Sequence, residues 1–476
     1  MNTFADAVRA TAQHAADRRV VLGENGTPAY ASTLNANVDL FGQVGGMRGK
    51  DITPLFSKAY AEDPIMALHV IQYARDIRGG MGEREAFRQA MRWLEVHDPR
   101  ALINTKVLEN LVEIGRFDDL LIFETFEVRE RAFELYREAL VAKNGLAAKW
   151  APRKGPVAAA LRAHLRLTPK QYRKLLVGLS NTVETKMCAK EWEAINFSHV
   201  PSVASLRYRK AFKRNAPEHY QAFLNSLQRG EAKVNAAAVF PHDVIRPLMP
   251  GMYSYNSATQ ADIVLAENMW KALPDYIDGP SRTLVMADVS GSMSGTPMEV
   301  SIALALYISE RQKSEAFKDL FLTFAGNPTF HSLRGLTTLK ERVDSTARAD
   351  WDMSTNFAGA LRLILDTAVR GNVPADEMPE QLLVVSDMQF NASWGLSGLE
   401  QIRRAYESAG YKVPQIVFWN VRATGNVPVR ADTNGVALVS GYSPATMRAV
   451  LSADADTFTP EGIMKKAVML PRYAVF

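Results

Sequence analysis

The chain of 476 residues contains a single cysteine, Cys188, and only eight histidines. One cysteine excludes an internal disulfide and a zinc site made of several cysteines, and it fits a reducing compartment. The histidines are dispersed and never stand as a pair or in a His-x-x-x-His pattern; His242, after Pro241, is expected to have a structural role at a helix start. Because these catalytic and zinc-binding patterns are missing, we expect a protein that is not an enzyme.

Long apolar runs are also missing. No stretch approaches the roughly 18 consecutive apolar residues of a membrane-spanning helix, and the amino terminus lacks the basic and then apolar segment of a secretory signal. We therefore expect a soluble, cytoplasmic protein with no membrane partner. In addition, no glycine pattern matches a P-loop, and no serine has the flanking glycines of a nucleophile elbow.

Charge is distributed unevenly along the chain, whose formal net charge is +5. Residues 143–214 contain 16 lysines and arginines but only three acidic residues, which gives this segment a net charge of +13. The remainder of the chain therefore carries −8. An asymmetry of this size predicts that the basic segment binds a polyanion.

Short β-prone runs alternate with helical patterns from residue 283 to the carboxyl terminus. This alternation predicts a doubly wound, mainly parallel sheet. We expect its strands at residues 283–289, 320–324, 329–333, 381–386, 415–420 and 435–439. We expect helices at residues 297–313, 357–369, 399–410 and 444–451.

The pattern between residues 51 and 250 is helical almost throughout. Apolar residues recur at the spacing of one helix face, as at Ala67, Val70, Ile71 and Ala74. Successive helices joined by short turns predict a domain of paired-helix, HEAT-like repeats.

These patterns divide the chain into four parts and predict the fold class α + α/β. The parts are an amino-terminal helix (residues 3–18) and linker within residues 1–50, helical repeats at 51–250, a bridging segment at 251–282 and the α/β domain at 283–476. The apolar final segment, residues 467–476, is expected to pack back onto the helical repeats.

A polar loop follows the first predicted strand of the α/β domain. It presents one carboxylate and two hydroxyls at alternate positions, Asp288, Ser290 and Ser292, and alternation in an extended loop points the three oxygens the same way. Ligands of open α/β sheets bind at the carboxyl ends of the strands, and hard oxygen donors suit Mg²⁺, Mn²⁺ or Ca²⁺ and not zinc. The alternative is that these side chains only cap the helix that starts near Pro297.

Two downstream residues could complete this site, Thr355 before a predicted helix and Asp387 at the end of a second strand. Asp-x-Ser-x-Ser, then Thr, then Asp at strand ends resembles the metal-ion-dependent adhesion site of von Willebrand factor A (vWA) domains. The resemblance implies that Asp288, Ser290, Ser292, Thr355 and Asp387 hold a divalent cation, Mg²⁺ or Mn²⁺, directly or through water. One metal position would stay open for an acidic group of a protein partner.

Lysines and arginines of the helical part stand in stretches that also contain tryptophan or tyrosine. Three such stretches are residues 73–84, 143–174 and 207–214. Nucleic-acid surfaces combine cations for phosphates with flat rings for unstacked bases, so these stretches predict a nucleic-acid surface. The alternative for each stretch is an ordinary solvated helix face.

A basic helical domain followed by a vWA domain resembles the Ro ribonucleoproteins (TROVE-module proteins). The chain is more similar still to a set of Ro-like vWA proteins found in phages, bacteria and eukaryotes. The stretches that carry this second resemblance are YARDIRGGMGER (residues 73–84), LTPKQYR (167–173), VETKM (183–187), FPH (240–242), DVSGSM (288–293) and IVFWN (416–420).

The Ro resemblance implies that the helical repeats close into a ring, clasped by the vWA domain, whose positive surface binds small non-coding or misfolded RNA. The implied RNA contacts are Lys149, Arg153, Lys154, Arg173, Lys174 and Lys186, with Arg75, Arg78 and Arg84 as a second group. Alternatively, Arg78 and Arg84 hold a turn through ion pairs with Asp76 and Glu83. We expect a monomer.

A competing function is a metal-dependent scaffold. In that case the metal at Asp288 captures an acidic residue of a protein partner, and the basic half of the chain is incidental.

Overall fold

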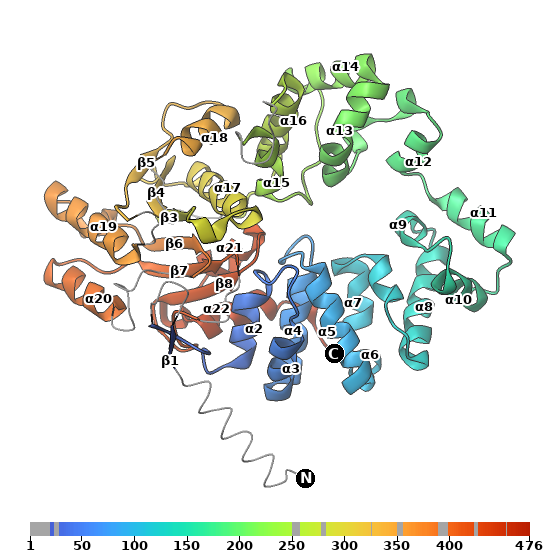
Figure 1. Ribbon diagram of the computed structural model, residues 1–476, viewed down its shortest axis with the longest axis horizontal. Coiled ribbons are helices and arrows are strands. Elements are labelled where there is room, and N and C mark those ends of the chain that lie inside the picture. Colours follow the sequence, from blue (N-terminus) through green and yellow to red (C-terminus); the bar gives the residue numbers. More distant parts are fainter. Residues whose placement is uncertain are drawn as a thin grey trace, which may run out of the picture.

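The computed structural model describes residues 20–22, 28–249, 258–277, 282–324, 326–349, 356–388, 398–422, 427–453 and 455–476. It combines a curved series of helices with an α/β domain that contains a mixed sheet (Figure 1). This is the predicted class, α + α/β. The helix predicted at residues 3–18 lies outside the described residues.

The α/β domain contains a six-stranded sheet in the order β5-β4-β3-β6-β7-β8. Neighbouring strands run parallel, except that β5 is antiparallel to β4. β3 and β6 are buried along their whole length, as expected for strands covered on both faces. The strands are β3 (Thr283–Asp288), β4 (Leu320–Phe324), β5 (Phe330–Ser332), β6 (Gln381–Ser386), β7 (Gln415–Asn420) and β8 (Val436–Ser440).

Alternate residues of these strands pack into two different layers. Leu284 and its equivalents face α19 and α20, whereas Val285 and its equivalents face α17, α21 and α22 in a layer that continues into the core of the helical part. The two parts of the chain therefore share one apolar core. The helices of the α/β domain are α17 (Thr296–Arg311), α18 (Leu339–Ala347), α19 (Phe357–Gly371), α20 (Gly398–Ser408), α21 (Met447–Leu451) and α22 (Pro460–Val468).

The helical part consists of short helices, several of which begin with proline, and in three of these a capping side chain precedes the proline. Asp63, Asp98 and Thr168 each accept a hydrogen bond from the first turn that follows, and proline suits the next position because it lacks an N–H. The helices are α2 (Ala36–Val44), α3 (Thr53–Glu62), α4 (Pro64–Arg75), α5 (Arg84–His97), α6 (Pro99–Asn104), α7 (Val107–Ile114), α8 (Phe126–Val141), α9 (Gly145–Trp150), α10 (Pro156–His164), α11 (Pro169–Leu179), α12 (Val183–Cys188), α13 (Ser202–Asn215), α14 (Pro217–Gln228), α15 (Pro241–Ile245) and α16 (Gln260–Lys271).

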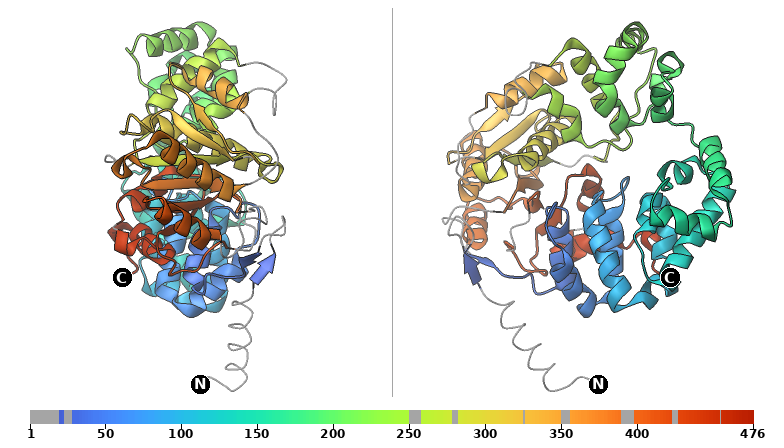
Figure 2. Two further views of the ribbon diagram at one scale, coloured as in Figure 1. Left: turned by 90° about the vertical axis from the view of Figure 1, so that its left-hand side faces the viewer. Right: turned by 45° about the vertical axis from the view of Figure 1, so that its right-hand side comes forward.

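Both ends of the helical series rest on the α/β domain. At the first end α2 packs on β8, and at the other end α15 packs on α17 and α16 on α18. The second end is also tied by an ion pair, in which Arg246 Nη2 lies 2.6 Å from Glu299 Oε2 in the first turn of α17. Figure 2 shows the intervening helices as an arc that leaves the α/β domain and returns to it.

The linker predicted before residue 50 is wrong at residues 36–44, because these residues form α2 and every residue of this helix is buried. Glycine at its end permits close contact instead of flexibility: a Cβ at Gly45 would lie 2.4 Å from the Gly441 nitrogen. The Gly45 N–H donates to Ser440 Oγ (3.1 Å), and that hydroxyl donates to the Phe41 carbonyl (2.6 Å). Tertiary packing therefore turned a glycine-containing segment into a helix of the core.

The final segment packs onto the helical part, as predicted. The Tyr473 hydroxyl donates to the Asp76 carboxylate (2.8 Å), and Arg472 forms an ion pair with the same carboxylate (2.8 Å). Gln72 Nε2 donates to the Tyr473 carbonyl (3.0 Å). These contacts join the end of the chain to α4.

Two helices of the α/β domain, α18 and α22, were not predicted. Each has nine residues, and so short a segment carries too few apolar positions to define a helical period. No helix within the described ranges is long and apolar enough to cross a membrane.

Replacing Asp76 by alanine removes the acceptor that Tyr473 and Arg472 share. Because Asp76 is 0% exposed, we expect the free energy of unfolding to fall by about 2–4 kcal/mol, measured by chemical denaturation. The matched change at the exposed Asp376 should alter it by less than about 0.5 kcal/mol. Equal stability of the two variants would show that the carboxyl-terminal segment does not anchor the fold.

Candidate functional site

The polar loop after β3 lies at the carboxyl edge of the sheet. Asp288 ends β3 and Asp387 directly follows β6; because the two strands are parallel neighbours, both carboxylates lie at the same edge. Each is 0% exposed. The structure thus brings together Asp288, Ser290, Ser292 and Asp387, whereas Thr355 lies outside the described residues. We call this region the strand-end loop.

Hydrogen bonds hold the Asp288 carboxylate within the strand-end loop. Its Oδ2 accepts from the Ser386 hydroxyl (2.6 Å), and its Oδ1 accepts from the Ser290 N–H (2.8 Å). The hydroxyl oxygens of Ser290 and Ser292 lie 3.2 Å apart. The loop does not cap α17, which follows Gly295 with no side-chain cap, so the capping alternative is wrong.

The electrostatics of this loop fit a divalent cation. Burial raises the pKa of Asp288 to about 6; the charge of Asp387 acts in the same direction, and the hydrogen bond from Ser386 opposes both. A cation between the two carboxylates would offset both the burial of Asp288 and its repulsion from Asp387. The oxygen donors of the loop match Mg²⁺ or Mn²⁺. No cluster of three or more His, Cys, Asp or Glu suited to a metal occurs in the described part of the chain, so a cation here would depend on two carboxylates, hydroxyls and water.

A groove of about 540 Å³ opens between α9, α12 and α13, and we call it the basic groove. Its cations and rings come from three segments: Lys149 and Trp150 from α9, Arg153 from the loop that follows, and Arg207 and Tyr208 from α13. Glu184 is the one acidic side chain among the described residues that line it. The groove therefore joins positive charge with half-buried aromatic rings.

The contacts within the basic groove are long. Lys149 Nζ lies 3.4 Å from the Glu184 carboxylate, to which the Tyr208 hydroxyl donates at 3.3 Å. Arg153 Nη2 donates to Ser180 Oγ, also at 3.3 Å. Bonds of this length are weak, so the cations can exchange these partners for a ligand.

The sequence predicted Lys149 and Arg153 but not Trp150, Arg207 or Tyr208. All five lie in the basic stretches 143–174 and 207–214, and these stretches are the sequence feature from which the groove residues could have been predicted. The convergence of the two stretches depends on the course of the chain between α9 and α13, which no local pattern reveals.

The other predicted cations of residues 143–214 lie at the surface outside the wall of the basic groove. Lys154, Arg173 and Lys174 are exposed, and Lys186 Nζ donates to the Ala194 carbonyl (2.8 Å). Their assignment as RNA contacts stays a prediction.

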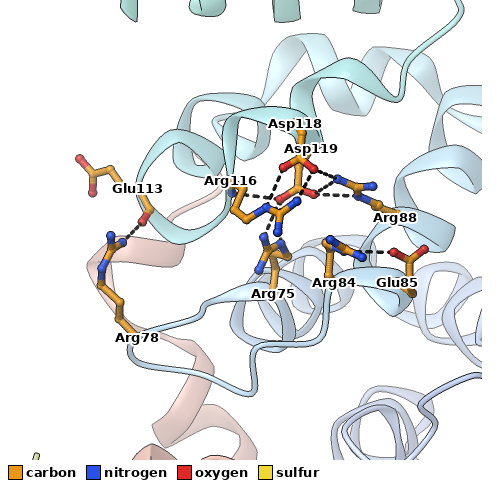
Figure 3. A network of polar contacts seen from close by, with 9 residues as sticks. All are labelled: Arg75, Arg78, Arg84, Glu85, Arg88, Glu113, Arg116, Asp118 and Asp119. Carbon is orange, nitrogen blue, oxygen red and sulfur yellow. Dashed lines mark hydrogen bonds and ion pairs between the residues drawn. The ribbon is translucent and has the colours of Figure 1, made fainter. Parts of the chain in front are cut away.

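Arg75 has a structural position, which corrects its assignment as an RNA contact (Figure 3). It is 1% exposed, and its Nη2 lies 2.7 Å from Asp119 Oδ2. Asp119 is itself 0% exposed and also pairs with Arg88 (2.8 Å). A guanidinium enclosed in this way has no surface for a phosphate, because burial of the ion pair requires both partners.

Arg78 and Arg84 lie nearer the surface. Arg78 Nη1 donates to the Glu113 carbonyl (2.7 Å), and Arg84 Nε lies 3.1 Å from the Glu85 carboxylate (Figure 3). The alternative ion pairs with Asp76 and Glu83 do not form. Those carboxylates pair instead with Arg472 and Arg48 (2.8 and 2.7 Å).

Comparison with known proteins divides the chain at the same place as the structure. Residues 23–122 and 159–279 match the family model described as Domain of unknown function (DUF2828), and residues 282–468 match the model described as Domain of unknown function (DUF7788). The class is thus a two-part protein, helical and then α/β. Uncharacterized protein L728 of Acanthamoeba polyphaga mimivirus is 29% identical over 493 residues, which cover 90% of this chain and 84% of the viral protein. This relative therefore extends across both parts.

Replacing Arg75 by methionine tests its structural role. The change keeps much of the side-chain volume but leaves the buried Asp119 short of one counter-charge, so we expect a loss of about 3 kcal/mol in the free energy of unfolding, measured by chemical denaturation. The same change at the exposed Arg153 should cost less than about 0.5 kcal/mol. A stable Arg75→Met protein would contradict the assigned role.

Proposed function

We propose that the protein is a non-enzymatic, Ro-like RNA-binding protein that holds small or structured non-coding RNA, including misfolded RNA, on its helical surface. The observation that carries this proposal is the basic groove, where cations and aromatic rings from α9 and α13 converge. Arginine and lysine neutralise phosphates, and a tryptophan or tyrosine ring stacks on an unpaired base. The +13 charge of residues 143–214 supports the same ligand, because it attracts a polyanion over a distance.

Trp150 is the ring best placed to stack on a base. It is half-buried, with the Arg116 guanidinium 3.6 Å from its ring centroid and Lys149 Nζ at 5.5 Å. The arginine lies against the ring and orients it, while the lysine stands beside it for a phosphate. A single-stranded segment could therefore place one base and one phosphate on neighbouring residues of α9.

The proposal includes the architecture of the Ro resemblance. In this architecture the helical arc and the α/β domain act as a closed ring, and the α/β domain is a vWA domain. The parallel sheet order and the two contacts of the arc with the domain support it. The exposed cations Lys154, Arg173, Lys174 and Lys186 would extend the RNA surface beyond the groove.

We further propose that the strand-end loop holds Mg²⁺ or Mn²⁺ through Asp288, Ser290, Ser292, Thr355 and Asp387. The cation would supply an open position for an acidic group of a protein partner. The exposed Arg422, whose guanidinium donates to the Ser292 carbonyl, adds a positive charge beside that position. This arrangement also favours the second candidate function, a metal-dependent interaction scaffold.

The first experiment is purification without nuclease, followed by sequencing of any bound nucleic acid. A defined small RNA that is released by salt is the expected result. If the purified protein carries no nucleic acid and does not bind single-stranded RNA at low salt, RNA binding is excluded. The second candidate function, the metal-dependent scaffold, would then be favoured.

Charge removal in the basic groove should change the salt dependence of RNA binding. For Lys149→Gln with Arg153→Gln, we expect the slope of log affinity against log salt for single-stranded RNA to fall by roughly 1.4, because each phosphate contact contributes about 0.7. Trp150→Ala should weaken binding by about 1–3 kcal/mol with the slope unchanged. Fluorescence anisotropy measures both quantities.

A matched control removes two charges outside the helical arc. Arg362 on α19 and Lys412 after α20 are exposed, and Arg362→Gln with Lys412→Gln should leave both affinity and slope unchanged. Equal effects of the two double variants would mean that RNA responds only to net charge and not to the groove.

Metal and RNA binding should be separable. Asp288→Ala with Ser290→Ala removes two proposed ligands, so calorimetry with Mn²⁺ should detect no binding, while RNA affinity is retained because the groove is built by other helices. The apolar strands should preserve the fold, as checked by circular dichroism. Loss of RNA binding in a folded variant would contradict the separation of the two sites.

A further inference from the structure

A second cavity, of about 620 Å³, lies where the helical arc meets the α/β domain, and we call it the junction cavity. Its wall combines the loop after α2, the turn between α4 and α5, the helix α13, the segment from Phe240 to Arg246 and Thr296 at the start of α17. Parts of the chain that are distant in sequence therefore build one concave surface.

Cationic side chains outnumber acidic ones in this wall, and three of them, Arg75, Arg116 and Arg246, form ion pairs with carboxylates behind it. Seven cationic side chains line it against three acidic ones. The cationic residues are Arg48, Lys50, Arg75, Arg84, Arg116, Arg207 and Arg246, and the acidic ones are Glu83, Glu85 and Asp243.

The arginines differ in how firmly they are held. Arg84 pairs only with Glu85, and both side chains are more than 40% exposed, so water screens the pair and an anion can displace it. Arg207 is exposed, and its guanidinium makes no ion pair or hydrogen bond with any other described residue. Arg48 keeps a side chain that is 36% exposed while it pairs with Glu83. The guanidinium groups of Arg84 and Arg207 can therefore turn toward a ligand, whereas Arg48 stays on Glu83, which is 5% exposed.

A buried imidazole in the same wall points independently to a ligand. His242 is 2% exposed, and its Nδ1 has no hydrogen-bond partner among the described residues. The ring is fixed by Phe240, with ring centroids 5.7 Å apart, and by Tyr442 at 5.4 Å. Burial lowers its pKa to about 4, so the ring is neutral at physiological pH. A buried polar atom without a partner is costly, and a ligand that reaches it would remove this cost.

We propose that the junction cavity binds a free phosphorylated small molecule of about the size of a nucleotide. Guanidinium groups form paired hydrogen bonds with phosphate oxygens. The volume falls within the range of about 300–1,000 Å³ of small-molecule sites. Met47, Ile77, Val203 and Phe240 give the wall an apolar part, which suits a base or another flat group.

This ligand does not depend on RNA binding. The junction cavity and the basic groove share only Arg207 among their described wall residues. Because the wall of the cavity includes Thr296 of the α/β domain as well as the helical residues, the bound molecule stabilises the junction between the two parts.

Calorimetry on the nuclease-treated full chain tests the proposal, with ATP, inorganic pyrophosphate and adenosine as probes and EDTA present to exclude metal-bridged binding. We expect ATP and pyrophosphate to bind and adenosine to bind at least about tenfold more weakly. Arg84→Gln, at a residue that lines the junction cavity and not the basic groove, should weaken ATP binding at least about tenfold, and its side chain is exposed enough for the fold to tolerate the change. The control Arg362→Gln with Lys412→Gln should bind ATP like the parent chain.

Two results would overturn the proposal. The first is no binding of ATP or pyrophosphate to the parent chain, whatever its affinity for RNA. The second is ATP binding that survives Arg84→Gln but disappears in Lys149→Gln with Arg153→Gln, which would place the phosphates in the basic groove. Failure of RNA binding with intact ATP binding would affect only the function proposed above.

Discussion

The contact of α2 with β8 fixes how the two parts of the chain meet. A Cβ at Gly42 would lie 2.8 Å from Leu438 Cδ2, so the helix can approach the sheet this closely only because that side chain is absent. This places the first end of the helical arc on the last strand of the sheet. With the second end held by Arg246 and Glu299, the positions of α9 and α13, and hence of the basic groove, follow from the two attachments.

Ion pairs with buried carboxylates distinguish the arginines that stabilise the fold from those that are available to bind a ligand. Asp119, Asp76 and Glu299 are buried carboxylates. Asp119 holds Arg75 within the helical part, whereas Asp76 and Glu299 hold Arg472 and Arg246 where the helical part meets the α/β domain. Removing the arginine from such a pair leaves a buried carboxylate without its counter-charge, which is costly. The cations on α9 to α13 meet few carboxylates, so they stay available for a polyanion. The charge of +13 on residues 143–214 therefore lies largely at the surface, whereas Arg75 at the end of α4 belongs to the fold.

The strand-end loop and the junction cavity approach each other at the start of α17. This helix follows the loop directly, Thr296 lies in the wall of the cavity, and Glu299 one turn later holds Arg246 of the same wall. The metal proposed for the strand-end loop and the phosphate proposed for the junction cavity would thus both lie beside the first turn of α17. RNA would bind farther along the arc, on surfaces that α9 and α13 create.

The local sequence pattern predicted the strands of the α/β domain well. β4, β6 and β7 begin and end at the predicted residues, because short apolar runs between polar loops define buried strands without further information. The Asp-x-Ser-x-Ser order also placed Asp288 and Asp387 at one sheet edge, since parallel strands align their carboxyl ends. The charge of residues 143–214 likewise follows from the sequence alone.

Only the tertiary structure decided that Arg75 is buried, that residues 36–44 form a helix and that Trp150 and Arg207 line the same groove. Each depends on contacts between residues far apart in the chain, and a local period contains no information about partners at that distance.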